Sequence, residues 1–309
     1  MYGVTNPTLE QMRLKTAYIQ DGIINAAVLA KLREPTVEDP FHSLTVKWAI
    51  KGQPLHVRTV VKNRDLVYLE ATGLRRLPDS GEIVGYQLLH SVEFPQTHRL
   101  SGSMRGNISI CGLYRQLKDG VVDLYGRGFV DPTGRLVRAL VVKSATEAML
   151  SSSRTMYTAQ LKKFAYAMRR RNVQGSLLSS RTDLRRKRSQ SLGGSTKACG
   201  ICCKTLSSLA SLSFGRMRHP SQCRLCGGVV CTSCRVKKTL ASIAPDDWLD
   251  ELEIPFCLLC VTAVTNANAF DIAVDELVHK DAQRGYGGAS VTSSMSSTER
   301  DSIEATTRF

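Results

Sequence analysis

Eight of the ten cysteines in this chain form four Cys-x-x-Cys pairs within a short C-terminal segment. The pairs are Cys199/Cys202, Cys223/Cys226, Cys231/Cys234 and Cys257/Cys260. Each pair can place two sulfurs on one metal ion through a tight turn, so eight thiols suffice for two tetrahedral zinc ions. Zinc ions surrounded by four thiolates would be structural, because no position remains for water or substrate.

Other uses of these cysteines fit the sequence less well. A disulfide framework requires an oxidising compartment, but no signal peptide is expected and Cys111 is the one cysteine before residue 199. A redox dithiol needs one pair near a βαβ pattern, whereas here four pairs share a loop-rich segment. Of the two unpaired cysteines, Cys111 is expected in the core, and Cys203 could replace Cys202 through a shift of one residue.

The chain is strongly basic, and its charge is concentrated in one stretch. Its 309 residues correspond to about two domains, with a formal net charge of +15 that favours anionic partners. Residues 162–188 carry ten basic residues and one acidic residue, Asp183. This stretch could be a solvated tether, a nuclear-import or nucleic-acid patch, or a segment attracted to anionic membranes. Nucleic acid is disfavoured because the Ser- and Gly-containing linker at 173–197 lacks aromatic residues for base stacking.

The remaining chain predicts an α+β fold. Residues 6–33 have helical spacing, and alternation with turn residues predicts strands at 44–50, 55–61, 66–71, 83–94, 105–117, 121–130 and 136–142. A long amphipathic helix is predicted over 144–171, with Ser144 and Glu147 as its capping box. A curved antiparallel sheet closed by such a helix is a helix-grip arrangement. Its concave face can enclose an apolar ligand, or helix and sheet can pack solidly.

Several short segments resemble the START-like lipid-binding domains of oomycete proteins, in which a FYVE-type zinc finger commonly follows. They are residues 38–41, 46–48, 65–70, 85–92 and 144–148, and the likeness runs from Pro40 to about Arg171. The START-like fold normally opens with a helix and strands before the segment that matches residues 1–33. The resemblance therefore implies an incomplete sheet, with one edge unpaired or covered by residues 1–33.

The resemblance to FYVE fingers implies how the cysteines pair and which residues meet a lipid. In the family's cross-brace, Cys199, Cys202, Cys231 and Cys234 hold one zinc, and Cys223, Cys226, Cys257 and Cys260 hold the other. The residues matching the basic phosphate pocket are Arg218, His219 and Arg224, although Gln222 stands where the family has a histidine. The family's membrane-insertion loop matches Leu206, Leu209, Leu212 and Phe214, which could equally form a short packed helix.

These observations predict a START-like domain at 1–172 that is incomplete at its N-terminus, a basic linker at 173–197, a cross-brace two-zinc finger at 198–264, a short helix at 265–280 and a disordered tail at 281–309. The six histidines suggest no catalytic triad, so no enzymatic activity is expected. The predicted function is a zinc-binding cytoplasmic adaptor, peripheral on endosomal membranes. Its expected partners are anionic lipids, among them phosphatidylinositol 3-phosphate, an apolar lipid in the START-like cavity, and other proteins. The alternative is a RING-like or tethering protein-interaction module that binds no lipid.

Overall fold

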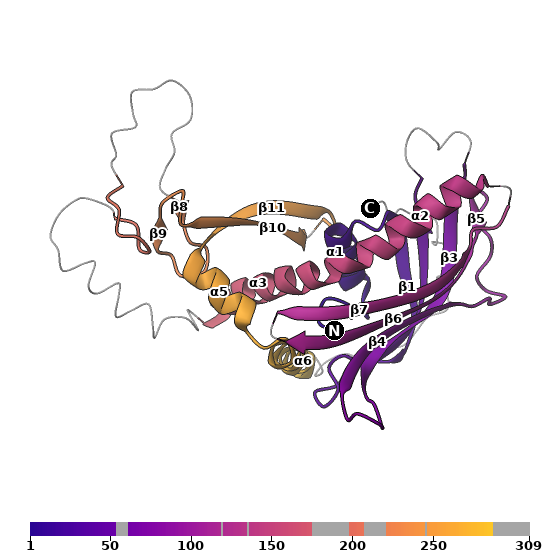
Figure 1. Cartoon of the computed structure of the whole chain (residues 1–309), viewed down its shortest axis with the longest axis horizontal. Helices are drawn as coiled ribbons and strands as arrows, with labels where there is room; N and C mark the ends of the chain where they lie inside the picture. The colour runs from indigo at the N-terminus through magenta and orange to yellow at the C-terminus, as the bar shows by residue number, and fades with distance from the viewer. Residues whose placement is uncertain are drawn as a thin grey trace, which may run out of the picture. The chain divides into compact units, whose positions relative to one another are not determined.

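The computed structural model describes residues 1–53, 61–118, 120–134, 136–174, 198–206, 221–244 and 246–286 (Figure 1). The chain divides into two compact units. The first, here called the sheet unit, comprises Met1–Ala159, Ile243–Leu249 and Phe270–Phe309. The second, the cysteine unit, comprises Gln160–Ser242 and Asp250–Ala269.

The sheet unit is built on a seven-stranded sheet in the order β1-β2-β3-β4-β6-β7. The strands are β1 (Ile23–Arg33), β2 (Ser43–Lys51), β3 (Asn63–Arg76), β4 (Ile83–Ser91), β5 (Ser103–Arg105), β6 (Asn107–Lys118) and β7 (Val121–Asp131). All neighbours on this path pair antiparallel. The short β5 lies off the path and pairs parallel with the start of β3. The predicted α+β class, an antiparallel sheet followed by a long helix, is confirmed.

Five of the predicted strands coincide with β2, β3, β4, β6 and β7. The strand predicted at 55–61 lies outside the described residues except for Val61. The short β5 was not predicted, because three residues give too little alternation to detect. Asp65 fixes β5 in place, since its buried carboxylate accepts hydrogen bonds from Ser103 Oγ at 2.9 Å and Arg105 Nε at 2.7 Å.

The prediction of one helix over residues 6–33 is wrong beyond residue 19. Helix α1 (Leu9–Ile19) begins at Thr8, whose hydroxyl accepts a hydrogen bond from the N–H of Gln11. It ends at Gln20, which has a left-handed backbone with φ of 54°, and Gly22 follows at φ of 78°. Two left-handed residues so close together stop the helix, and the following Ile, Val and Ala residues then form β1.

The strand predicted at 136–142 is also wrong, because helix α2 (Arg138–Ser151) begins there. A single turn of 3-10 helix (Ser152–Arg154) joins α2 to α3 (Thr155–Gln174). The hydroxyls of Ser151, Ser152 and Ser153 each donate to the carbonyl three residues earlier. This back-bonding competes with regular helix geometry and accounts for the irregular turn. Ser144 and Glu147 lie inside α2, so they form no capping box.

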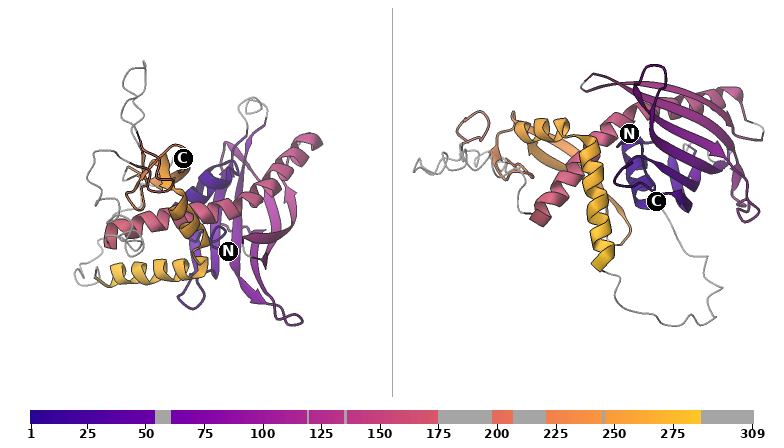
Figure 2. Two further views of the ribbon diagram at one scale, coloured as in Figure 1. Left: turned by 60° about the vertical axis from the view of Figure 1, so that its left-hand side comes forward. Right: turned by 90° about the horizontal axis from the view of Figure 1, so that it is seen from below.

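The inner face of the curved sheet is occupied by α1 and the N-terminal residues (Figure 2). Met12 of α1 joins a buried cluster with Ala26, Ala49, Tyr68 and Ile108 from four strands. The side chain of Met1 lies over Gly85, because a Cβ atom added to Gly85 would be only 2.4 Å from the sulfur of Met1. Over this part of the sheet the interior is therefore filled by the chain's own side chains.

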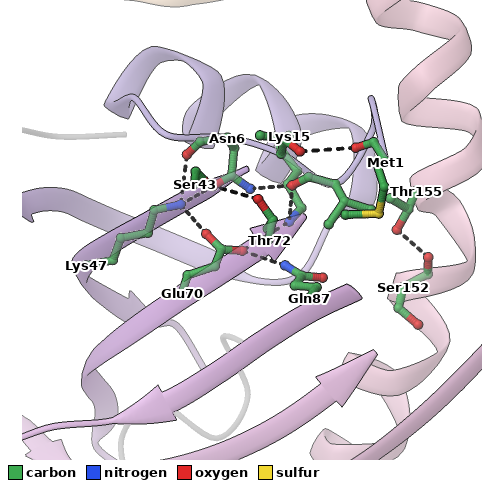
Figure 3. A network of polar contacts seen from close by, with 12 residues as sticks. Met1, Asn6, Lys15, Ser43, Lys47, Glu70, Thr72, Gln87, Ser152 and Thr155 are labelled. Atoms are coloured by element: carbon green, nitrogen blue, oxygen red, sulfur yellow. Dashed lines mark hydrogen bonds and ion pairs between the residues drawn. The ribbon is translucent and has the colours of Figure 1, made fainter. Parts of the chain in front are cut away.

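A buried polar network crosses the same face of the sheet (Figure 3). Lys47 of β2 donates to the side chain of Glu70 on β3 and to the backbone carbonyl of Asn6 at 2.8 Å. The other carboxylate oxygen of Glu70 accepts from Gln87 Nε2 on β4 at 2.5 Å, and Lys15 lies 3.9 Å from it. An ionic network in this position is unlike the lining that a cavity for an apolar ligand would need, and it fits the alternative in which helix and sheet pack solidly.

The cysteine unit contains α3 from Gln160 onward and the segments around the cysteine pairs. Its strands are β8 (Ser221–Gln222), β9 (Val229–Val230), β10 (Arg235–Ile243) and β11 (Leu249–Cys257), of which the last two continue into the sheet unit. Helix α5 (Leu258–Asn266) follows β11. The next helix, α6 (Ala269–Tyr286), belongs to the sheet unit from Phe270 onward. The core forms around the rings of Phe164 and Phe256, which are fully buried with centroids 4.8 Å apart.

The two C-terminal helices correspond only in part to the one helix predicted at 265–280. Helix α5 was missed because it begins within the last cysteine pair. Among the described residues, no single helix is long and apolar enough to cross a membrane. Helices α5 and α6 meet the length and composition criteria together, but the chain is sharply bent at the break between them.

Candidate metal centres

The eight paired cysteines converge in two groups of four. The sulfurs of Cys199, Cys202, Cys231 and Cys234 lie within 4.8 Å of one another, and so do those of Cys223, Cys226, Cys257 and Cys260. Each group draws on alternate pairs, which is the interleaved grouping that the FYVE resemblance implies. Neither group contains Cys203 or Cys111. Such spacing suits four ligands around one ion, since sulfurs about 2.3 Å from a tetrahedral zinc are slightly under 4 Å apart.

Tight backbone turns present the first cysteines of both groups. In the turn at Cys223, the N–H of Cys223 donates to Gly228 O and the N–H of Gly227 donates to Cys223 O, both at 2.8 Å. Gly227 follows Cys226 and has a φ of 72°. The left-handed region costs glycine little, so this residue lets the chain reverse directly after the second ligand.

The turn at Cys199 repeats this geometry with a different residue. The N–H of Cys199 donates to Lys204 O at 2.9 Å, and the N–H of Cys203 donates to Cys199 O at 3.0 Å. Cys203 has a φ of 59° and occupies the place that Gly227 holds in the other turn. Its side chain is exposed, and the group of four sulfurs includes the preceding residue, Cys202, but not Cys203. The structure therefore assigns Cys202 to the group and gives Cys203 the role of a turn residue.

Electrostatics within the groups indicate that a cation is needed. Burial would raise the pKa of Cys199, but N–H groups of Cys202, Cys231 and Ile201 outweigh it and lower the pKa to about 6. The pKa of Cys234 is raised to about 12, chiefly because its thiol donates a hydrogen bond to the sulfur of Cys231. The pKa of Cys257 is raised for the same reason, chiefly by Cys223. Four thiolates so close together repel one another unless a cation sits between them, so the donor sets fit a divalent metal that prefers sulfur.

The predicted lipid-binding residues are only partly described. Arg218 and His219 lie outside the described residues, as do Leu209, Leu212 and Phe214 of the proposed insertion loop. Leu206 is half-buried and precedes that gap. Arg224 is exposed between the ligands Cys223 and Cys226, and its N–H donates to Pro255 O at 2.9 Å. Its own carbonyl accepts from the guanidinium of Arg171 on α3.

An exposed apolar pair beside the second cysteine group was not predicted. Leu258 and Leu259 separate the ligands Cys257 and Cys260, and they are 51% and 53% exposed. Holding Cys257 and Cys260 on one ion turns the intervening leucines outward. The sequence carries no signal for this exposure, because Leu225, which also lies between two ligands of this group, is buried.

Comparison with solved structures finds distant likenesses. No protein-family model matches the chain, and no curated protein matches its sequence. Similar solved structures include human StAR-related lipid transfer protein 5 (TM-score 0.35, 13% identity, covering 47% of this chain and 62% of that one). Human STARD10 has a TM-score of 0.34 at 19% identity, with 48% and 54% covered. The lipid transfer and protein localization domain of human StarD13 has 0.35 at 15%, with 50% and 72% covered.

The chain spans less than two thirds of the first two of these structures. Likenesses at these TM-scores are too distant to support a functional argument. The fold assignment given above therefore rests on the strand order and the helices of this chain.

Proposed function

We propose that this protein is a non-enzymatic adaptor that binds anionic membrane surfaces and is held in shape by two structural zinc ions. The observation that carries the proposal is the convergence of eight cysteines into two groups of four sulfurs. Four thiolates complete the tetrahedral shell of a zinc ion and leave no open position for a reacting water. The metal would supply folding free energy and hold the surrounding loops.

The surface beside the second cysteine group supports contact with a membrane. Leu258 and Leu259 project from the turn that holds two ligands, and the exposed Arg224 is hydrogen-bonded through its N–H to the strand leading into that turn. Apolar tips flanked by cations bind the boundary between headgroups and acyl chains, where each basic residue near the surface contributes about 1 kcal/mol. The basic linker in the sequence adds charge of the same sign. We infer binding to anionic lipid with little preference among phosphoinositides.

Vesicle sedimentation tests this proposal on the zinc-loaded full chain. Vesicles containing phosphatidylserine, with and without phosphatidylinositol 3-phosphate, should bind the wild type, and binding should fall as salt is raised. The double variant Leu258→Ser/Leu259→Ser should bind several-fold more weakly with both zinc ions retained. Leu252→Ser on β11 is the matched control, because Leu252 is 59% exposed and lies outside the ligand turn. If the wild type bound none of these vesicles, the result would favour the alternative function, a protein-interaction module that binds no lipid.

A further inference from the structure

Strand β7 forms one edge of the sheet, and among the described residues no other strand pairs with its outer side. It is 11 residues long and pairs with β6 along its whole length. An edge of this length presents a row of unpaired backbone N–H and C=O groups to any strand of matching pattern. Natural edges are usually short, bulged or otherwise blocked, but the one register shift recorded against β6 lies at the very start of β7.

The two faces of β7 differ in what they carry. A Cβ on Gly126 would lie 3.3 Å from Met149 of α2, so the even-numbered residues face that helix. The odd-numbered residues point to the opposite face, where Tyr125 is 57% exposed and Phe129 is 64% exposed. Tyr125 lies directly opposite Leu113 of β6, which is also exposed. The outer edge and this aromatic face together form an unpartnered surface.

The sequence of β7 is complementary to itself along its central residues when two copies pair antiparallel about Tyr125. If Tyr125 lies opposite Tyr125 of a second copy, Asp123 of each chain lies opposite Arg127 of the other, and Val121 lies opposite Phe129. On the helix-facing side the same register sets Leu124 against Gly126 and Val122 against Gly128. Shifting the register by two residues in either direction removes both ion pairs and leaves charges opposite apolar residues. Opposite charges directly across an antiparallel pair stabilise it, and like charges destabilise it.

We propose that β7 is a self-association surface, on which two copies of this chain pair antiparallel about Tyr125 and join their sheets into one. The twofold axis through Tyr125 repeats the Asp123–Arg127 pair on both sides, as a closed dimer interface requires. Asp123 lies 3.6 Å from Arg115 within its own sheet, and its carboxylate has further acceptor positions. For Arg127 the described part of the chain shows no acidic partner, so its charge is available to the second copy.

The association should be reversible and weak, because a single strand pair is at the small end of specific interfaces, below about 1,200 Å² in total. Sedimentation equilibrium of the zinc-loaded full chain, from roughly 1 to 200 µM, covers the micromolar range expected for such an interface. The mass of the wild type should rise from that of one 34.0 kDa chain toward twice that value. A wild type that stays monomeric over the whole range would overturn the proposal.

Charge reversal distinguishes this register from any other interface. Asp123→Arg alone and Arg127→Asp alone each place like charges opposite each other, so each variant should remain monomeric. In an equal mixture, both arginines of the Asp123→Arg chain face aspartates of the Arg127→Asp chain, so the two variants should regain the dimer as a heterodimer. The double variant carrying both reversals should also self-associate. Dimers of either single variant that match the wild type, or a mixture that stays monomeric, would sink the idea.

Two further variants test whether loss of the dimer could come from misfolding or from a general effect of the changed charge. Tyr125→Lys changes a side chain exposed in the monomer and sets two lysines opposite each other, so it should abolish the dimer without reversing a charge. Arg33→Asp is the matched control on β1, at the opposite edge of the sheet, and should associate like the wild type. Circular dichroism on each variant checks that the sheet is retained. Loss of the dimer in the Arg33→Asp variant would contradict the assignment to β7.

Discussion

Cys202 and Cys203 are adjacent cysteines with separate roles. Cys202 Sγ lies 3.7 Å from Cys231 Sγ, whereas Cys203 holds the left-handed turn position after the ligand. We expect Cys202→Ser to reduce the zinc content by one ion per chain and Cys203→Ser to leave it unchanged. Metal analysis of the two purified variants checks this, and loss of zinc in the Cys203→Ser variant would show that the neighbour is the ligand.

The Lys47–Glu70 ion pair is deeply buried in the sheet unit. Burial alone would raise the pKa of Glu70, but Lys47, Lys15 and the hydrogen bonds from Lys47 and Gln87 outweigh it and hold the pKa below its ordinary 4.5. We expect Lys47→Met to lower the free energy of unfolding by about 3 kcal/mol, because it leaves a buried carboxylate without its main partner. Adding Glu70→Leu should recover much of this loss. Denaturant titrations at neutral pH measure both effects.

The same pair predicts a pH dependence with a definite sign. Because the pKa of Glu70 is lowered in the folded state, its stabilisation is present above pH 4.5 and is lost as the pH falls below that value. In the Lys47→Met variant the carboxyl favours its protonated form. The gap in unfolding free energy between wild type and variant should therefore shrink below pH 4.5. A gap that widens on acidification would contradict the role given to this pair.

At the scale of elements, helix α3 belongs partly to the cysteine unit. From Gln160 onward its residues are in that unit, and Lys163 Nζ donates to the carbonyls of Thr265 at 2.9 Å and Ala267 at 2.6 Å at the end of α5. The cysteine pairs alone bury few large side chains. Helix α3 supplies Phe164, which completes the core beside Phe256.

Removing the Phe164 ring should therefore destabilise the metal sites from outside them. We expect Phe164→Ala to cost about 3–5 kcal/mol through the cavity it leaves and to speed zinc release to a chelator. A chromogenic chelator assay on wild type and variant measures the release rate. Met156→Ala is the control, because Met156 lies on the same helix and is 42% exposed. Equal release rates in all three proteins would refute the contribution of α3 to the metal sites.

The elements differ in how well local sequence predicts them. Strands such as β2 and β3 alternate regularly and were predicted, and the cysteine grouping followed from a family pattern of spacing. Residues 23–33 were mistaken for helix because alanine and leucine suit both structures, and the two left-handed residues that end α1 carry no strong signal. The Lys47–Glu70 network could not be foreseen, since both residues sit at positions that alternation alone does not mark as buried.

At the scale of the molecule, the basic linker and the single residue Arg224 of the cysteine unit should contribute differently to the proposed lipid binding. Linker charges attract any anionic surface and are screened over about 10 Å at 0.1 M salt. We expect neutralising Arg185, Arg186, Lys187 and Arg188 together to weaken vesicle binding more than Arg224→Ala does. Sedimentation with anionic vesicles at two salt concentrations compares them. A selective pocket would give a different result. The protein would then bind tightly to phosphatidylinositol 3-phosphate alone, and this binding would be lost in Arg224→Ala but kept in the linker variant.

The central claim is that two zinc ions, each held by four thiolates, organise the cysteine unit. Metal analysis of the folded full chain, combined with X-ray absorption at the zinc edge, tests it most directly. The account predicts two zinc ions per chain with a shell of sulfur alone at about 2.3 Å. One ion or none on folded protein, or nitrogen or oxygen in the shell, would contradict it.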